Sequence, residues 1–201
     1  MGSEFNTSEK SCYITIDEFN HLISKTNYFS FLSYNIRSFN CNSDTFFSMF
    51  SSCNSFPDVI CFTETWFLES NTEEILGYKS YHTIRTERRS GGVSVYVRHQ
   101  YNSKLLPNYS FCNNEIEICT VEILLNNSNI LVIGIYRPHS GNISNFIENL
   151  NSILDEPYAR NKLCVIVGDF NMNILSDNPQ VNSFMYNMQS YHFFPLSYPA
   201  Y

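Results

Sequence analysis

The chain has 201 residues, a net charge of −7, and 43% hydrophobic against 15% charged residues. These values exclude a disordered or fibrous chain and suit one domain with a sizeable core. They argue against a protein that holds nucleic acid by bulk positive charge, but not against a nuclease whose acidic residues hold a cation. No apolar run approaches the roughly 20 residues that span a bilayer, so we expect no membrane partner.

The N-terminal residues and the cysteines predict an intracellular protein. Residues 1–20 contain no apolar segment of the kind found in secretory signal peptides. The seven cysteines are odd in number, none are spaced as Cys-x-x-Cys, and several fall inside apolar runs. We therefore expect reduced, buried thiols rather than disulfides or a zinc site, and a protein that is not secreted.

Hydrophobic patterning predicts strands interleaved with a few helices. Residues 1–27 form a lead-in segment, of which residues 1–5 (MGSEF) look like a cloning remnant, and residues 28–201 form the domain. In chain order we expect a strand at 29–36, a helix at 44–52 with Ser43 as its N-cap, strands at 58–62 and 92–98, a hairpin of 115–125 and 130–136, a helix at 144–154, a strand at 163–167 and a helix at 179–189.

This order of elements predicts an α/β fold in which two packed, mostly antiparallel sheets carry helices on their outer faces. Residues 193–201 (FFPLSYPAY) are apolar and aromatic, without a charged tail. Because a chain terminus is usually solvated, we expect the domain to be incomplete at its C-terminal end.

Polar side chains follow several predicted strands at the point where each apolar run ends. They are Asn35, Glu64, Tyr136 with Arg137, and Asp169 with Asn171. If the strands lie side by side, these groups converge, and the two carboxylates repel unless a cation lies between them. Mg²⁺ binds through one or two carboxylates together with water and phosphate oxygens. The pattern therefore predicts a site for metal-assisted phosphodiester hydrolysis. Each residue alone is more simply a turn or capping residue, and only the combined order favours this chemistry.

Five spaced blocks contain these residues: 33–38 (SYNIRS), 58–66 (DVICFTETW), 89–93 (RSGGV), 134–138 (GIYRP) and 167–171 (VGDFN). In their order and residue types, these blocks resemble those of the endonuclease/exonuclease/phosphatase family. Within it they are most similar to the apurinic-like endonuclease domain of jockey-like non-LTR retrotransposon polyproteins, and residues 16–20 (IDEFN) are similar to the lead-in of those polyproteins.

The resemblance implies a four-layer α/β/β/α sandwich and a role for each residue. Glu64 would be the main Mg²⁺ ligand, Asn35 would orient Glu64 or a metal-bound water, and Asp169 would lie at the metal and deprotonate the attacking water. Asn171 would hydrogen-bond Asp169 or the scissile phosphate. Tyr136 would donate to a phosphate oxygen as charge develops there, an effect that can be worth about 3–4 kcal/mol.

The sequence departs from the family pattern in two places. Some relatives have an acidic residue where this chain has Arg37, which argues against a second metal ion. The family's final block, Ser-Asp-His or similar, is absent, and the last histidine, His192, does not match it. We therefore expect this chain to be weakly active or inactive, and a chain continued through its native reading frame to be far more active.

Four further residues are candidate contacts to a DNA backbone: Arg88 and Arg89, which with Arg85 form the basic cluster before Gly91, and also Arg137 and His139. A solvated hairpin explains the basic cluster equally well, since Glu87 interrupts it. A loop histidine without a role is the simpler interpretation of His139, and Trp66 is expected to pack in the core.

The resemblance predicts a divalent-metal-dependent endonuclease that nicks target DNA and leaves a 3′ hydroxyl, which a downstream reverse transcriptase in the full polyprotein extends. We expect Mg²⁺ as the cofactor, with Mn²⁺ as the alternative ion, and a nuclear site of action. Two other interpretations stay open. One is a phosphatase or phosphodiesterase of the same fold, and the other is a non-catalytic remnant that only folds or only binds.

Overall fold

The computed structural model describes residues 15–24, 29–86, 90–125, 128–156, 162–174 and 176–195. None of the helices in these ranges is long and apolar enough to cross a membrane. The elements are α1 (Ile16–Ser24), β1 (Phe31–Asn35), α2 (Phe39–Phe50), β2 (Val59–Thr63), β3 (Tyr78–Thr83), β4 (Val93–Arg98), β5 (Asn102–Leu105), the 3-10 helix η1 (Pro107–Tyr109), β6 (Phe111–Cys112), β7 (Glu117–Leu124), β8 (Asn129–Tyr136), α3 (Ile143–Leu154), β9 (Leu163–Asp169) and α5 (Pro179–Ser190).

The strands form two sheets of mixed direction. The first has the order β1-β2-β4-β3, and the second has the order β5-β7-β8-β9, with β6 paired to β7. Most neighbours are antiparallel, as the sequence predicts. Each sheet also contains one parallel pair, β1 with β2 and β8 with β9. Parallel pairing brings the carboxyl ends of the two strands to the same edge of the sheet.

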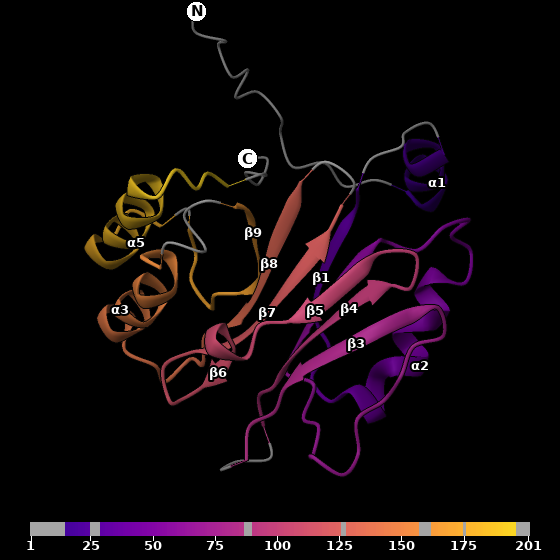
Figure 1. Cartoon of the computed structure of the whole chain (residues 1–201), viewed down its shortest axis with the longest axis horizontal. Coiled ribbons are helices and arrows are strands. Elements are labelled where there is room, and N and C mark those ends of the chain that lie inside the picture. The colour runs from indigo at the N-terminus through magenta and orange to yellow at the C-terminus, as the bar shows by residue number, and fades with distance from the viewer. Residues whose placement is uncertain are drawn as a thin grey trace, which may run out of the picture.

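The two sheets pack face to face, and helices cover their outer faces (Figure 1). Alternating side chains explain the layers, because β2 and β4 place valines and Cys61 toward the second sheet, and Ile60, Phe62 and Tyr96 toward α2. A third apolar cluster joins the second sheet to α3 and α5. The order α2, sheet, sheet, α3 with α5 is the expected four-layer α/β/β/α sandwich.

A glycine in β8 sets how closely the sheets approach. A Cβ atom at Gly134 would lie 2.9 Å from Cγ2 of Val95 and 3.0 Å from the sulfur of Cys61, both in the first sheet. Cys61 and Cys119 are fully buried in this interface. No two of the six cysteines in the described residues form a disulfide, as the sequence predicts. The predicted burial holds for Cys61 and Cys119 only, since Cys41 is exposed and the other three are partly exposed.

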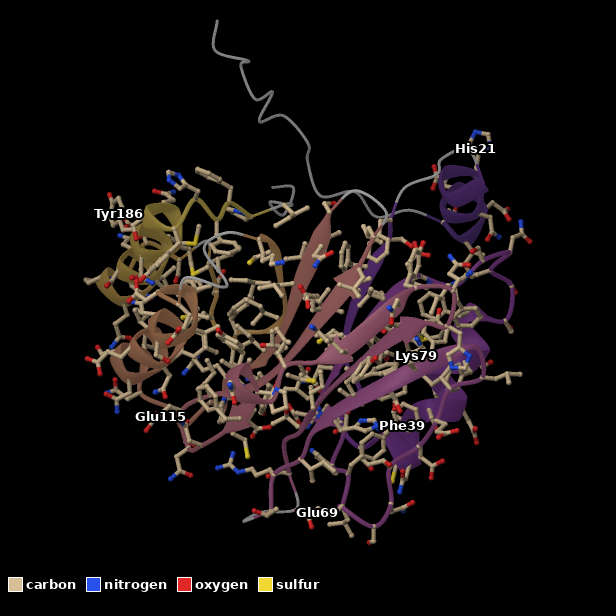
Figure 2. The ribbon with its side chains drawn as sticks, viewed as in Figure 1. His21, Phe39, Glu69, Lys79, Glu115 and Tyr186 are labelled. Atoms are coloured by element: carbon tan, nitrogen blue, oxygen red, sulfur yellow. The ribbon has the colours of Figure 1, made fainter. Side chains whose placement is uncertain are left out.

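The first long helix begins earlier than the sequence predicts. α2 starts at Phe39, so Ser43 is not its N-cap, and the preceding Ser38 has a φ of 82° and makes no capping hydrogen bond through its side chain. Phe39 is buried among Phe62, Phe67 and the ring of Tyr96 where α2 meets the first sheet (Figure 2). This aromatic packing fixes the helix start in place of a local capping signal.

Several short elements are not among those predicted from the sequence. α1 lies within the segment treated as a lead-in, and β3, β5, β6 and η1 are absent from the predicted elements. The two-residue β6 and the polar β5 and β3 lack an apolar run, and β3 gains its place by pairing with the buried β4. These elements extend the sheets without changing their predicted packing.

A half-buried histidine in β3 lies against the first core. His82 Nδ1 lies 2.8 Å from the hydroxyl oxygen of Ser94, and its ring meets those of Phe67 and Tyr96 edge-on. Burial lowers the pKa of His82 to about 4. In the unfolded chain a histidine has a pKa of about 6.5, so below that pH the unfolded state binds a proton that the folded state excludes.

We predict that His82 makes the free energy of unfolding fall by about 2–3 kcal/mol as the pH drops from about 6.5 to about 4. The variant His82→Gln should lose that part of the pH dependence, because it has no group that protonates on unfolding. Urea unfolding at several pH values measures this. The control His99→Gln, at an exposed position after β4, should keep the wild-type slope. Equal slopes for wild type and His82→Gln would contradict the prediction.

Candidate active site

The predicted site residues lie at the carboxyl ends of the parallel strands. Asn35 ends β1 and pairs in register with Thr63, the residue before Glu64. In the second sheet Tyr136 ends β8 and pairs with Asp169, which ends β9. Because the two sheets face each other, the four polar side chains meet at one rim of the sandwich.

The side-chain amide of Asn35 joins the two carboxylates. Its Nδ2 atom donates to Oε1 of Glu64 and to Oδ2 of Asp169, each at 2.8 Å. Glu64 directly follows β2 of the first sheet and Asp169 ends β9 of the second, so one nitrogen connects the ends of both sheets. Two carboxylates this close repel each other, and the shared amide donors offset part of that repulsion.

The hydroxyl of Tyr136 donates to Glu64 Oε1 at 3.1 Å. Tyr136 is only 8% exposed. Burial, and secondly the negative charge of Glu64, raise the pKa of Tyr136 above its usual value. The phenol therefore stays protonated at neutral pH and is a permanent hydrogen-bond donor beside the carboxylates.

Arg137 has a different environment from the one expected for a DNA contact. It is 5% exposed, and its guanidinium donates to the backbone oxygens of Phe170, Gly141 and Asn171 at 2.6–2.8 Å. Burial lowers the pKa of Arg137. Since these donors are engaged inside the protein, Arg137 ties the loop after β8 to the segment after β9, and does not present its guanidinium to a ligand.

Asn171 completes the support of Asp169. Its backbone N–H donates to Asp169 Oδ1 at 2.9 Å, and its side-chain Nδ2 donates to the carbonyl oxygen of Arg137 at 2.6 Å. The predicted link between Asn171 and Asp169 is thus made through the backbone rather than the amide side chain. Both oxygens of Asp169 accept a hydrogen bond, which fixes the plane of the carboxylate.

Backbone strain is concentrated at the same strand ends. Among the described residues, six that are not glycine have positive φ, and five of them follow β1, β2 or β9. Such conformations cost of order 1–3 kcal/mol each and persist only where the surroundings hold them. The five are Arg37 (45°), Ser38 (82°), Glu64 (54°), Trp66 (55°) and Asn171 (47°).

Two buried polar atoms beside Glu64 also make no hydrogen bond in the described structure. They are the hydroxyl of Thr63 and the indole N–H of Trp66. Each unpaired buried group costs about 1–3 kcal/mol. Strain and unpaired polar groups together are typical of a segment shaped for binding rather than for stability.

The donors at this rim fit a hard cation. In the part of the chain that the structure describes, no group of three or more His, Cys, Asp or Glu side chains could hold a metal ion. The rim offers two carboxylates with neighbouring amides, and no described residue donates a hydrogen bond to Glu64 Oε2. Mg²⁺ needs only one or two carboxylates and takes its other oxygens from water and substrate, so these residues suit it.

The remaining candidates lie outside this arrangement. His139 is exposed in the loop after β8. Arg88 and Arg89 lie outside the described residues. Arg85, from the same cluster, is buried and pairs with Glu117, which is not among the residues predicted from the sequence. β7 is buried along nearly its whole length, so both of its faces are covered, and nothing in the local sequence says that the Glu117 carboxylate lies inside the protein.

Comparison with known proteins supports both the fold and the family. A search of curated protein sequences finds no match to the chain. The endonuclease domain of TRAS1, a telomere-specific non-LTR retrotransposon, is 13% identical with a TM-score of 0.66, and the match covers 85% of this chain and 75% of that one.

Two further solved structures share the fold. An AP endonuclease from Archaeoglobus fulgidus is 13% identical with a TM-score of 0.56, and the match covers 80% of this chain and 69% of that one. The 3′ phosphatase NExo from Neisseria, bound to a product DNA hairpin, is 13% identical with a TM-score of 0.54, and the match covers 81% of this chain and 70% of that one. The model of the Endonuclease/Exonuclease/phosphatase family matches residues 32–190, which is most of the chain and includes all four rim residues. The chain belongs to the endonuclease/exonuclease/phosphatase family.

Proposed function

We propose that the protein is a divalent-metal-dependent DNA endonuclease of a non-LTR retrotransposon, which nicks target DNA and leaves a 3′ hydroxyl for a reverse transcriptase. The observation that carries the proposal is the meeting of Glu64 and Asp169 on one amide nitrogen of Asn35. The structural likeness to the TRAS1 endonuclease domain supports the retrotransposon part, as does the wording of the sequence blocks 33–38 and 134–138.

The metal would be held by Glu64, with Asn35 and Asp169 beside it. A bound Mg²⁺ or Mn²⁺ supplies Lewis-acid stabilisation of the charge that develops on the phosphate and on the leaving 3′ oxygen. Asn35 keeps the two carboxylates oriented by donating to both of them. Asp169, with its plane fixed, would accept the proton of the attacking water.

Tyr136 and Asn171 complete the proposed site. The hydroxyl of Tyr136 lies at the carboxylates and stays protonated, so it can turn its donor to a phosphate oxygen as negative charge increases there. The backbone N–H of Asn171 holds Asp169 in place.

The proposed partner is the phosphate backbone of DNA, and the proposed place of action is the nucleus, where target DNA lies. In the full polyprotein, a reverse transcriptase would use the 3′ hydroxyl. His139 is exposed near the end of β8 and is retained as a candidate phosphate contact, together with Arg88 and Arg89.

One observation favours a second candidate function. The solved structures with this fold include a 3′ phosphatase as well as endonucleases, and the site residues suit either reaction. A phosphatase or phosphodiesterase with a small phosphate substrate is therefore the alternative activity.

The first prediction concerns the metal. Asn35→Asp places a third carboxylate at the rim and removes the shared donor, so in a chelator the variant should be about 1–3 kcal/mol less stable than wild type. Adding Mg²⁺ should stabilise the variant more than the wild type, because the ion offsets the added repulsion. Thermal unfolding with and without Mg²⁺ measures both effects. The control Asn145→Asp adds the same charge on the exposed face of α3, and should respond to Mg²⁺ as wild type does.

The second prediction concerns the reaction. Supercoiled plasmid should be nicked only with Mg²⁺ or Mn²⁺, and Asp169→Asn should lower the rate by about 100-fold or more, because it removes the proton acceptor. Extension by a DNA polymerase identifies the 3′ hydroxyl. Asp177→Asn, at an exposed position, is the matched control. Hydrolysis of a soluble phosphomonoester without nicking would establish the phosphatase alternative. Inactivity on both substrates, in a folded protein continued through its native reading frame as well as in this chain, would support a remnant.

A further inference from the structure

A buried ion pair lies behind the active-site rim. Nη1 of Arg85 lies 2.8 Å from Oε1 of Glu117, and Nη2 donates to Oδ1 of Asn114 at 2.9 Å. Glu117 is fully buried and Arg85 is 8% exposed. Burying two charges carries a desolvation penalty that their attraction often fails to repay, so stability alone is a weak reason for such a pair.

The second oxygen of Glu117 holds a pair of glycines. Its Oε2 atom accepts a hydrogen bond from the backbone N–H of Gly92 at 2.5 Å. Gly91 has a φ of 100°, and a Cβ atom there would overlap the carboxylate of Glu117. The carboxylate thus fills the space that a side chain at position 91 would need, and it fixes the backbone of both glycines.

The glycines in turn hold the backbone around Glu64. The carbonyl oxygen of Gly91 accepts from the N–H of Trp66 at 2.9 Å, and that of Gly92 accepts from the N–H of Thr65 at 3.3 Å. Glu64 and Trp66 both have left-handed backbone conformations that residues with side chains rarely adopt. Contacts from outside the segment have to hold it in this shape.

Glu117 also approaches the rim from the opposite direction. It pairs in register with Tyr136 across β7 and β8, and the hydroxyl of Tyr136 donates to Glu64. Glu117 is therefore a neighbour of both groups that place Glu64. It accepts a hydrogen bond from the glycine pair, whose carbonyl groups hold the backbone next to Glu64, and it pairs across the sheet with the tyrosine that contacts the Glu64 side chain.

We infer that the Arg85–Glu117 ion pair is a positioning device for Glu64, acting through Gly91 and Gly92 to hold residues 64–66 in the shape that presents the Glu64 carboxylate to Asn35 and Asp169. The effect of this Glu64 position on metal binding rests on the proposed function. The mechanical link itself rests on the hydrogen bonds alone, and it can be tested without metal or substrate.

The test compares two matched variants in β7. Glu117→Gln leaves one acceptor oxygen for the two donors that now use both oxygens of the carboxylate, so one of these bonds is lost. Glu122→Gln is the control, since Glu122 is also a buried carboxylate, 1% exposed, and is paired with Lys104 at 3.0 Å at the far end of the same strand. Thermal unfolding first establishes that each variant folds.

Two readouts separate the inference from the proposed function. The first is hydrogen exchange of the Thr65 and Trp66 amides without metal, which should be at least about tenfold faster in Glu117→Gln than in wild type. The second is Mg²⁺ affinity, followed through the fluorescence of Trp66, the only tryptophan, and it should weaken by about 10–100-fold. Glu122→Gln should match wild type in both.

If Glu117→Gln fails to fold, the double variant Arg85→Met/Glu117→Leu takes its place, because an apolar pair removes both buried charges together. It also lacks the acceptor for Gly92, so the same two effects are expected. Unchanged exchange and unchanged Mg²⁺ affinity in a folded variant, or equal effects in Glu122→Gln, would overturn the inference. If the wild type itself binds no Mg²⁺, the metal proposal fails, and the exchange rates decide the inference alone.

Discussion

Two carboxylates from different sheets share the amide nitrogen of one asparagine, with 2.8 Å from Asn35 Nδ2 to Glu64 and 2.8 Å to Asp169. The arrangement requires the ends of β1 and β9 to face each other across the sandwich, so the packing of the sheets and the geometry of the site are a single constraint. A small residue such as Gly134 between the sheets allows the close approach that this constraint needs. A one-residue slip in the pairing register of β1 or β9 would turn its site residue to the opposite face of the sheet.

Hydrophobic patterning predicts the parts of the fold that depend on local alternation. β4 and β7 alternate with a period of two, β2, β8 and β9 are short apolar runs, and α3 and α5 have one apolar face; the predicted ranges overlap all of these elements. The start of α2 could not be found in this way, because Phe39 is placed by aromatic rings from other elements and not by a cap. For the same reason the polar β3 could not be predicted from its own sequence, since it is a strand because it pairs with β4.

The candidate site shows the same division. Its carboxylates stand out in the sequence because each follows an apolar run, and parallel pairing then brings such ends together. Arg137 also stands out, next to Tyr136, but its role depends on carbonyl groups more than thirty positions away, to which no local pattern points. Glu117 and Arg85 are concealed for a related reason, since charge alone does not reveal that a side chain is buried.

The negative charge of the chain and of the rim determines how a phosphodiester substrate can be attracted. The chain has a net charge of −7, and the rim contributes two carboxylates, so a phosphodiester approaching without a cation would be repelled. Arg137 does not attract the substrate, because its guanidinium donates to backbone oxygens inside the protein. For the proposed nuclease, attraction at the rim must then come from the bound cation and from the protonated Tyr136. Any dependence of binding on salt would then come from phosphate contacts away from the rim, for which the retained candidates are His139, Arg88 and Arg89.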